Sequence, residues 1–163
     1  PGFVEALGLI GSSQIQGRCS AGGNLCNASP AADSVSAMIA NRAVCNIVGP
    51  GGERRVAVED FNTGPRTNCL ADNEILISID FPLPAPRSSD AYLRMIPRTE
   101  MDIAVVGVGV SLTIKDGTVT AARVGLGAVA PTVLLVEDAA KALIGSKLDD
   151  AALAKAAAAC SAA

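Results

Sequence analysis

The sequence predicts an α+β fold, because a hairpin-based sheet in the second half of the chain is followed by two helical patterns. Every even position of residues 104–114 is apolar, which is the period-two pattern of a strand with one core face. Lys115-Asp116-Gly117 is a hairpin turn signal, and residues 118–129 are expected to return antiparallel. Residues 136–144 and 149–160 then have helical patterns, so strands precede helices, as in α+β proteins.

The first 40 residues predict two helices around a glycine-rich stretch. Apolar residues at i, i+3, i+4 and i+7 favour a helix over residues 3–10, which Gly11 is expected to end. Residues 14–19 are short and polar, and we expect them to be extended. Asp33 or Ser34 can cap a second helix that carries apolar residues on one face.

Residues 43–81 predict three strands. Residues 43–48 and 54–58 flank a Gly-Pro-Gly-Gly turn and are expected to pair as a hairpin. Residues 60–73 are rich in polar and turn-forming residues, which indicates a loop. In residues 75–81 isoleucine alternates with other residues, which predicts a half-buried strand.

Pro82, Pro84 and Pro86 predict a linker between two domains, residues 1–86 and 87–163. The net charge is −3 and the basic residues are scattered, which argues against a nucleic-acid partner. No apolar run reaches the roughly 20 residues that a membrane helix needs.

The chain has no histidine, which excludes a Ser-His-Asp or Cys-His nucleophile and any histidine-ligated metal. Its five cysteines include no C-x-x-C pair, and free thiols in a reducing cytoplasm are the expectation. Any chemistry at this chain therefore depends mainly on a bound cofactor.

The stretch of residues 20–33 is the strongest candidate site. It begins with a hydroxyl, two adjacent glycines and an amide side chain. Adjacent glycines let main-chain N–H groups approach a ligand closely, and successive N–H groups in such a turn can bind phosphate. A structural glycine-rich turn is the alternative that composition leaves open.

Residues 125–130 match G-x-G-x-x-A, the dinucleotide fingerprint, but their context does not fit it. Pro131 follows at once and an extended pattern precedes the motif, whereas the fingerprint needs a helix to begin within it. We therefore expect these glycines to serve a strand or a bulge.

Several charged residues have simpler interpretations than a role in catalysis. Arg98, close to Glu100 and Asp102, is expected to form ion pairs at the surface. The pairs at residues 59–60 and 149–150 have no partner acid or base nearby in the sequence, and we interpret them as solvated turn or cap residues.

Several short motifs, in this order and spacing, resemble one family. Gln14-Ile15 is followed by Ser20-Ala21-Gly22-Gly23-Asn24 and by Ser29-Pro30-x-x-Asp33. Glu74-Ile75-Leu76, Arg98-x-x-x-Asp102-Ile103-Ala104, Asp116-Gly117, Leu126-Gly127 and Glu137-Asp138-Ala139-Ala140 come later. Together they are similar to the FAD-binding medium subunit of the molybdenum hydroxylases, the carbon monoxide dehydrogenase and xanthine dehydrogenase family.

The resemblance implies the second lobe of a vanillyl-alcohol-oxidase-type FAD-binding domain, followed by a flavoprotein C-terminal domain of a small antiparallel sheet and helices. It implies that the SAGGN residues hold the FAD pyrophosphate and that a carboxylate accepts hydrogen bonds from the ribityl or ribose side. It also implies an arginine where the family commonly has a lysine close to the flavin, and two apolar contacts. The implied residues are Ser20, Ala21, Gly22, Gly23, Asn24, Asp33, Arg94, Leu76 and Ile10.

The function implied is that of an oxidoreductase subunit that passes electrons from iron–sulfur clusters through FAD to an acceptor. The partners implied are an iron–sulfur small subunit and a molybdopterin large subunit, in a cytoplasmic hetero-oligomer. The family has a second glycine-rich loop in an N-terminal lobe, before the point that matches Pro1. The chain is thus expected to be N-terminally truncated and to bind FAD weakly or not at all by itself. A non-catalytic scaffold or interaction module is the alternative function.

Overall fold

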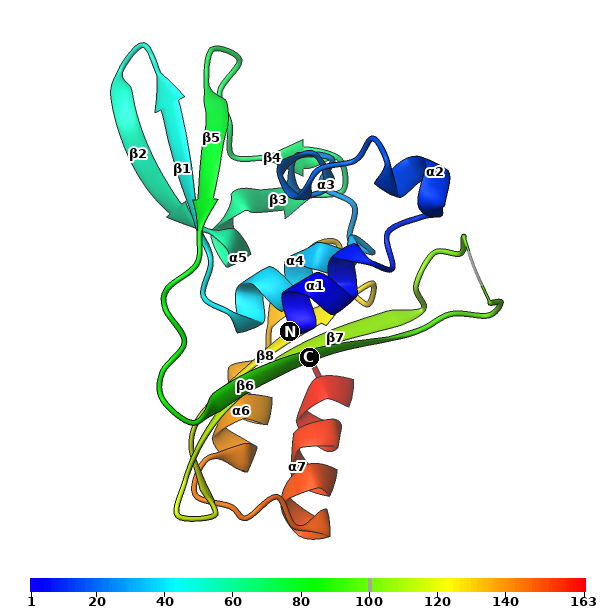
Figure 1. Ribbon diagram of the computed structural model, residues 1–163, viewed down its shortest axis with the longest axis vertical. Coiled ribbons are helices and arrows are strands. Elements are labelled where there is room, and N and C mark those ends of the chain that lie inside the picture. The colour runs from blue at the N-terminus through cyan, green and yellow to red at the C-terminus, as the bar shows by residue number, and fades with distance from the viewer. Residues whose placement is uncertain (100) are drawn as a thin grey trace.

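The computed structural model describes residues 1–99 and 101–163, and the strands of this part form three antiparallel sheets. One sheet has the order β2-β1-β5, one has the order β3-β4, and the largest has the order β6-β7-β8-β9 (Figure 1). The strands of the first two sheets are β1 (Val44–Gly49), β2 (Gly52–Ala57), β3 (Asn62–Gly64), β4 (Thr67–Asn68) and β5 (Ile75–Asp80). Those of the third are β6 (Ser88–Met95), β7 (Val106–Lys115), β8 (Thr118–Gly127) and β9 (Leu134–Leu135).

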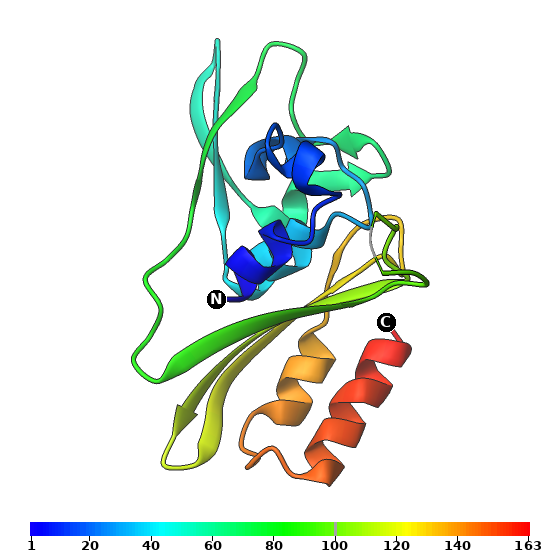
Figure 2. The ribbon, with the colours of Figure 1, turned by 45° about the vertical axis from the view of Figure 1, so that its right-hand side comes forward.

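Helices separate and cover these sheets. The helices are α1 (Gly2–Leu7), α2 (Ser13–Gln16), α3 (Ala21–Cys26), α4 (Asp33–Ala40), α5 (Val58–Phe61), α6 (Glu137–Leu143) and α7 (Asp150–Ser161). In both ribbon views α1 and α4 lie on one face of the four-stranded sheet, and α6 and α7 lie on the other (Figures 1 and 2). The α+β prediction is confirmed.

Helix α4 is buried along its whole length because it lies directly against the sheet backbone. Ideal Cβ atoms added at Gly109 of β7 and at Gly125 of β8 would both collide with the carbonyl group of Ser36, the former at 2.5 Å from the oxygen. These two glycines are paired across the strands. The first three residues of the G-x-G-x-x-A motif lie at the end of β8, as expected of a strand. The missing side chain at Gly125 leaves space for α4 rather than for a nucleotide.

The predicted elements of the second half are confirmed. Asp116 and Gly117 both have positive φ, 51° and 76°, and form the tight turn between β7 and β8. Gly145, with φ 84°, follows α6. Asp149 caps α7 by accepting a hydrogen bond from the Ala152 N–H at 2.9 Å.

Three predictions for the first half are wrong in detail. The first helix ends at Leu7, before Gly8, because glycine is a poor helix former. Residues 14–19 are not extended; Ser12 stands at the N-cap position of the short helix α2. Residues 60–73 are not only loop, since they contain the end of α5 and the β3-β4 hairpin.

Strand β5 is present as predicted, but its isoleucines do not share a buried face. Ile75 and Ile77 are 61% and 60% exposed, whereas Leu76 and Ile79 pack against the core. The register between β1 and β5 shifts between Asn46 and Ile47, which is a β-bulge. Because side chains alternate strictly only in a regular ladder, a one-residue shift changes which of them face inward.

Candidate functional site

The SAGGN residues form the start of a helix rather than a loop. Ser20 is the N-cap of α3, and its hydroxyl oxygen accepts a hydrogen bond from the Gly23 N–H at 3.0 Å. Neither Gly22 nor Gly23 has positive φ. The expectation that the glycines supply an unusual backbone turn is therefore wrong, because the serine cap makes this segment helical.

The first turn of α3 leaves two backbone donors without a partner among the described residues. Within the described residues, the N–H groups of Ala21 and Gly22 donate to no protein acceptor, as is usual for the first residues of a helix. The nearest atom to an ideal Cβ at Gly22 is Leu76 Cδ2, at 3.7 Å. Because Cβ atoms tilt toward the helix N-terminus, a side chain at Gly22 would take up space beside these donors.

Asn24 connects α3 to the start of α4. Its side-chain oxygen accepts a hydrogen bond from the Ser34 hydroxyl at 2.6 Å. Ser34 is fully buried and follows Asp33 in the first turn of α4. The SAGGN residues and the predicted carboxylate are thereby held side by side.

Asp33 and Arg94, which are far apart in the sequence, form an ion pair that is shielded from solvent. Arg94 Nη1 lies 3.0 Å from Asp33 Oδ2 and 3.2 Å from Oδ1. The side chains are only 8% and 10% exposed. Arg94 comes from β6, so the structure joins α3, α4 and β6 in one polar cluster.

The two predicted apolar contacts differ in position. Leu76, on β5, is partly buried and faces Gly22, so it belongs to the same site. Ile10 follows α1 and is buried, with 7% of its surface exposed.

Tyr92 and Ser34 are the members of this cluster that the sequence analysis missed. The Tyr92 hydroxyl donates a hydrogen bond to Asp33 Oδ1 at 2.7 Å. Burial, followed by this hydrogen bond and the charge of Asp33, raises the pKa of the Tyr92 phenol. A signal was present: Tyr92 is two residues before Arg94, and in a strand this spacing puts both side chains on the same face.

Glu59 was wrongly interpreted as a solvated residue. Its Oε1 is paired with Arg123 Nη2, and Arg123 Nε also donates to the Ile39 carbonyl oxygen at 2.5 Å. This pair joins α5, the end of α4 and β8. By contrast Arg98 pairs with Asp102 at 3.0 Å and is 70% exposed, as predicted.

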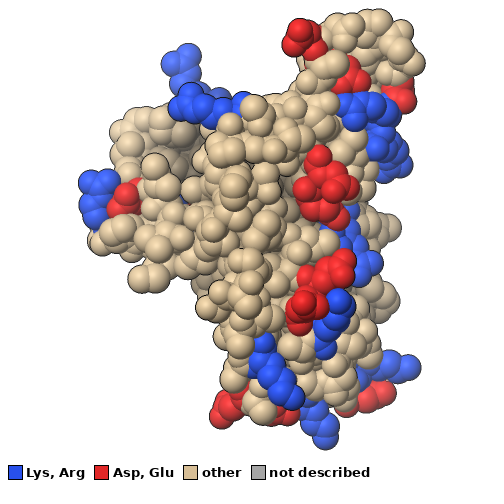
Figure 3. All heavy atoms as spheres, turned by 180° about the vertical axis from the view of Figure 1, so that it is seen from behind, with Lys and Arg blue, Asp and Glu red and all other residues tan. Residues whose placement is uncertain are grey.

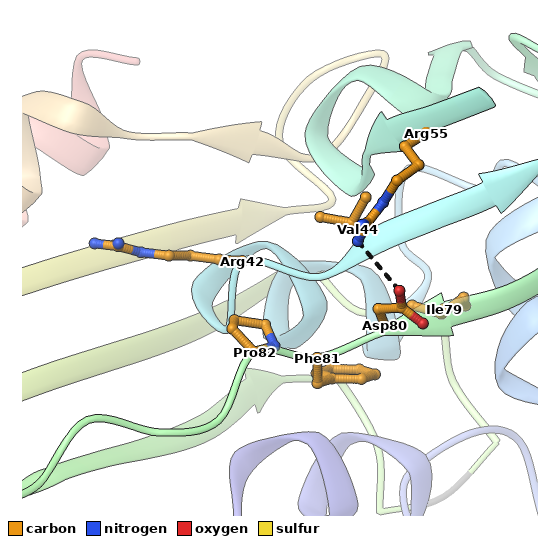
Figure 4. A pocket seen from close by; sticks show the side chains of 7 residues that line it. All are labelled: Arg42, Val44, Arg55, Ile79, Asp80, Phe81 and Pro82. Carbon is orange, nitrogen blue, oxygen red and sulfur yellow. Dashed lines mark hydrogen bonds and ion pairs between the residues drawn. The ribbon is translucent and has the colours of Figure 1, made fainter.

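The cavities lie elsewhere. One, of about 530 Å³, is lined by residues at the ends of β1, β2 and β5, where Arg55 and Asp80 are paired at 3.1 Å (Figure 4). None of its lining residues is a predicted cofactor contact. On the face in Figure 3, blue and red side chains are interspersed rather than gathered into one basic or acidic patch.

Neither a metal-binding cluster nor a membrane-spanning helix occurs within residues 1–99 and 101–163. No group of three or more cysteine or acidic side chains there could hold a metal ion. No helix in this part is both long and apolar enough to cross a bilayer.

Comparisons with known proteins agree with these features. The profile of the FAD binding domain in molybdopterin dehydrogenase matches residues 1–84, and that of the CO dehydrogenase flavoprotein C-terminal domain matches residues 91–163. This fold and site define a flavoprotein subunit, and the chain belongs to the FAD-binding subunits of the molybdenum hydroxylase family.

Two bacterial relatives illustrate the similarity. The carbon monoxide dehydrogenase medium chain of Afipia carboxidovorans is 35% identical over 156 residues, which cover 96% of this chain and 54% of the relative. The xanthine dehydrogenase FAD-binding subunit of Escherichia coli is 31% identical over 141 residues, 85% of this chain and 48% of the relative. The chain thus spans about half the length of these curated relatives.

Solved structures show the same fold. Carbon monoxide dehydrogenase from Hydrogenophaga pseudoflava, in a form that lacks the Mo-pyranopterin moiety, matches with a TM-score of 0.92 at 33% identity. The match covers 98% of this chain and 55% of that one. The reconstituted CO dehydrogenase from Oligotropha carboxidovorans gives a TM-score of 0.90 at 35% identity, over 94% and 54% of the two chains.

The polar cluster fits one part of FAD. The free N–H groups at the start of α3 are donors suited to phosphate oxygens, and no side chain at Gly22 blocks them. Arg94 adds a permanent positive charge close by.

Proposed function

We propose that this chain forms one wall of the FAD site in a molybdenum hydroxylase, through which electrons pass from iron–sulfur clusters to an acceptor. The observation that carries the proposal is the convergence of four separate segments. Residues of α3, α4, β5 and β6 that the family resemblance selects meet at one place, through the Asn24–Ser34 hydrogen bond, the Asp33–Arg94 pair and the Gly22–Leu76 approach.

In this proposal the start of α3 binds the FAD pyrophosphate. The N–H groups of Ala21 and Gly22 donate to its oxygens, Ser20 caps the helix, and Gly23 and Asn24 complete the turn. Asp33 and Arg94 lie toward the ribityl and flavin side, and Leu76 and Ile10 add apolar contacts. When bound, FAD supplies the capacity to accept and release electrons.

The assembly is proposed on the same basis. We infer partnership with an iron–sulfur small subunit and a molybdopterin large subunit, in a cytoplasmic hetero-oligomer, because the relatives are named as one subunit or chain of such enzymes. We further propose that the boundary between the FAD-binding part and the C-terminal domain lies at residues 86–87. The matched profile regions, which end at residue 84 and begin at residue 91, support this.

FAD titration tests the cofactor proposal. The chain supplies one wall of the site and is expected to bind FAD weakly, with a small but saturable quenching of flavin fluorescence. A Gly22→Val variant is expected to lose this because the added side chain fills the space before α3. A Gly51→Val variant is the control, since nothing lies within 4 Å of an added Cβ there. A folded wild-type chain that gives no saturable quenching would contradict the proposal and favour an interaction module.

A further inference from the structure

Three of the five cysteines share one hydrophobic core, although they are far apart in the sequence. Cys45 of β1 is completely buried in this core, and Cys26 and Cys69 pack against it while partly buried. Cys160 packs against a different cluster, and Cys19 is exposed. All five are free thiols. The core of the first half of the chain thus holds a group of thiols that the proposed function does not use.

The segments that carry Cys26 and Cys69 are in direct contact. Cys26 is the last residue of α3, and Cys69 directly follows β4. The side-chain amide of Asn68 donates a hydrogen bond to the Cys26 carbonyl oxygen at 3.0 Å. Both ribbon views show α3 beside the β3-β4 hairpin (Figures 1 and 2). A disulfide requires neighbouring backbones of this kind, with the two Cα atoms within about 7 Å of each other.

Cys69 has the surroundings of the thiol that reacts first. Arg54 Nη2 donates to the Cys69 carbonyl oxygen at 2.8 Å and lies 3.9 Å from the Cys69 Sγ. The Glu74 carboxylate accepts from Arg54 Nε and Nη2 at 2.8 Å and 2.7 Å, and so holds the guanidinium in place. An N–H donor beside the sulfur stabilises the thiolate, which is the form that attacks an oxidant. Because Cys69 is only partly buried, a small oxidant can reach it.

Cys26 is better placed than Cys45 to be the second thiol. Burial, followed by the neighbouring Cys69 and Cys26, raises the pKa of Cys45 to about 12. Cys45 is also fixed in β1, which is paired with a strand on each side. Burial and then Cys69 raise the pKa of Cys26 too, but Cys26 is partly exposed at the end of a helix. Cys26 therefore stays a thiol until Cys69 is oxidised, and its segment is less constrained than β1.

We propose that Cys26 and Cys69 are a redox-sensitive pair, which hydrogen peroxide joins in a disulfide between the end of α3 and the segment after β4. The Cys69 thiolate attacks a peroxide oxygen and becomes a sulfenic acid, while the O–O bond breaks and the leaving hydroxide takes up the proton that the thiol released. The Cys26 sulfur then attacks the Cys69 sulfur, the S–O bond breaks, and the Cys26 proton leaves in a second water. Both thiols are oxidised and the peroxide is reduced to water. The proposal does not depend on the flavin site.

Peptide mapping identifies the pair. In a Cys19→Ser background, trypsin places each remaining cysteine in a separate peptide, namely residues 19–42, 43–54, 67–87 and 156–163. The folded chain is treated with stoichiometric hydrogen peroxide, and free thiols are blocked with iodoacetamide before digestion. We expect mass spectrometry to show peptides 19–42 and 67–87 cross-linked, and dithiothreitol to separate them. A cross-link between 67–87 and 43–54 would make Cys45 the partner and overturn the proposal, as would thiols that all remain free.

Serine variants in the same background test the order of the two steps. Cys26→Ser is expected to leave Cys69 as a sulfenic acid that dimedone labels, and Cys69→Ser is expected to leave Cys26 as a free thiol. Cys160→Ser is the matched control, because it removes a partly buried thiol of another cluster and should keep the cross-link. Circular dichroism shows whether each variant is folded. Dimedone on Cys26 of the Cys69→Ser variant would contradict the assignment of Cys69 as the first thiol.

The urea midpoint gives a readout that depends on the native fold. A disulfide between residues far apart in the sequence restricts the unfolded chain, so the oxidised chain is expected to unfold at a higher urea concentration than the reduced chain. Cys26→Ser is expected to lose this difference. Gel filtration should show a monomer, and a disulfide-linked dimer would overturn the proposal. An oxidised chain with an equal or lower midpoint would mean that the bond does not fit the native fold, and would also overturn it. Failure to bind FAD would overturn the proposed function alone, because none of these measurements contains FAD.

Discussion

Two glycine pairs in this molecule serve opposite purposes. Gly109 and Gly125 lie under the backbone of α4, where an added Cβ would collide with Ser36. Gly22 and Gly23 lie at the start of α3, where the nearest atoms to an added Cβ are Leu76 Cδ2 at 3.7 Å and the Ser20 hydroxyl oxygen at 3.0 Å. The first pair is closed by the fold, whereas an added Cβ at Gly22 would make only an ordinary van der Waals contact.

Glycine spacing alone does not reveal a nucleotide site. The G-x-G-x-x-A motif, which begins in β8, matches a cofactor fingerprint. Yet α4 of the same chain occupies the space beside its first glycine, Gly125. The less distinctive SAGGN stretch keeps free N–H donors. Substitutions should therefore affect stability in the first region and ligand affinity in the second.

The largest expected effect is on stability at the closed pair. Gly125→Ala is expected to lower the free energy of unfolding by about 3 kcal/mol, because the new methyl group forces α4 away from the sheet. Urea denaturation followed by circular dichroism measures this. Gly51→Ala is the control, with a change within about 0.5 kcal/mol. Equal stabilities of the two variants would contradict the claim that α4 leaves no room for a side chain at Gly125.

Arg123 tests a second contact that holds α4 to the sheet. Arg123→Met leaves the Glu59 carboxylate without its cation, with the two side chains 18% and 21% exposed. We expect a loss of about 2 kcal/mol, below the range for fully buried pairs because some solvent remains. Arg55→Met is the matched control, since its pair with Asp80 is 64% and 52% exposed and should be worth less than about 0.5 kcal/mol. Similar losses in both variants would contradict the proposal that Arg123 helps to hold α4 against the sheet.

A substitution at Gly22 should change FAD affinity rather than stability. Gly22→Ala is expected to leave stability unchanged or to raise it by about 0.5 kcal/mol, since alanine favours a helix and an added Cβ meets no close atom. FAD affinity is expected to fall about 10-fold, equivalent to about 1.4 kcal/mol. Parallel denaturation and fluorescence titrations measure both properties. A destabilised variant with normal affinity would reverse the roles of the two pairs.

The smallest expected effect is on the pH dependence of the free energy of unfolding, through the Arg54–Glu74 ion pair. Arg54 and the Ala71 N–H hold the Glu74 carboxylate and lower its pKa from 4.5 to about 2. A depressed folded-state pKa contributes stability that is fully present above the unfolded pKa and is lost as the pH falls through the folded pKa. The stability difference between wild type and Glu74→Gln should thus shrink between pH 4.5 and about 2. A difference that is constant over this window, in urea titrations at several pH values, would contradict this role.

Local signals predicted the second half of the fold well. The alternation in β7, the Asp116-Gly117 turn and the capping aspartate of α7 each act within a few residues. The start of α4 was predicted in position only: Ala32 is the N-cap and no side chain caps the helix, so the expectation that Asp33 or Ser34 caps it is wrong.

The errors arose where distant segments decide the structure. The face of β5 depends on a bulge opposite β1, and the burial of Glu59 depends on Arg123, 64 residues away. Tyr92 reaches Asp33 across 59 residues. The positions of the proposed cofactor residues came from family resemblance, whereas their connection through Ser34 and Tyr92 required the structure.

Helix α4 also decides what happens if the chain is cut. The proline linker is highly exposed, with Leu83 at 95%, and is a natural site for a protease. Yet α4 precedes the linker and packs against β7 and β8, which follow the linker. Arg123 of β8 also donates a hydrogen bond to the Ile39 carbonyl oxygen near the end of α4. Nicking the linker should therefore yield two fragments that stay together and can be expressed separately to reassemble, as in split-protein complementation.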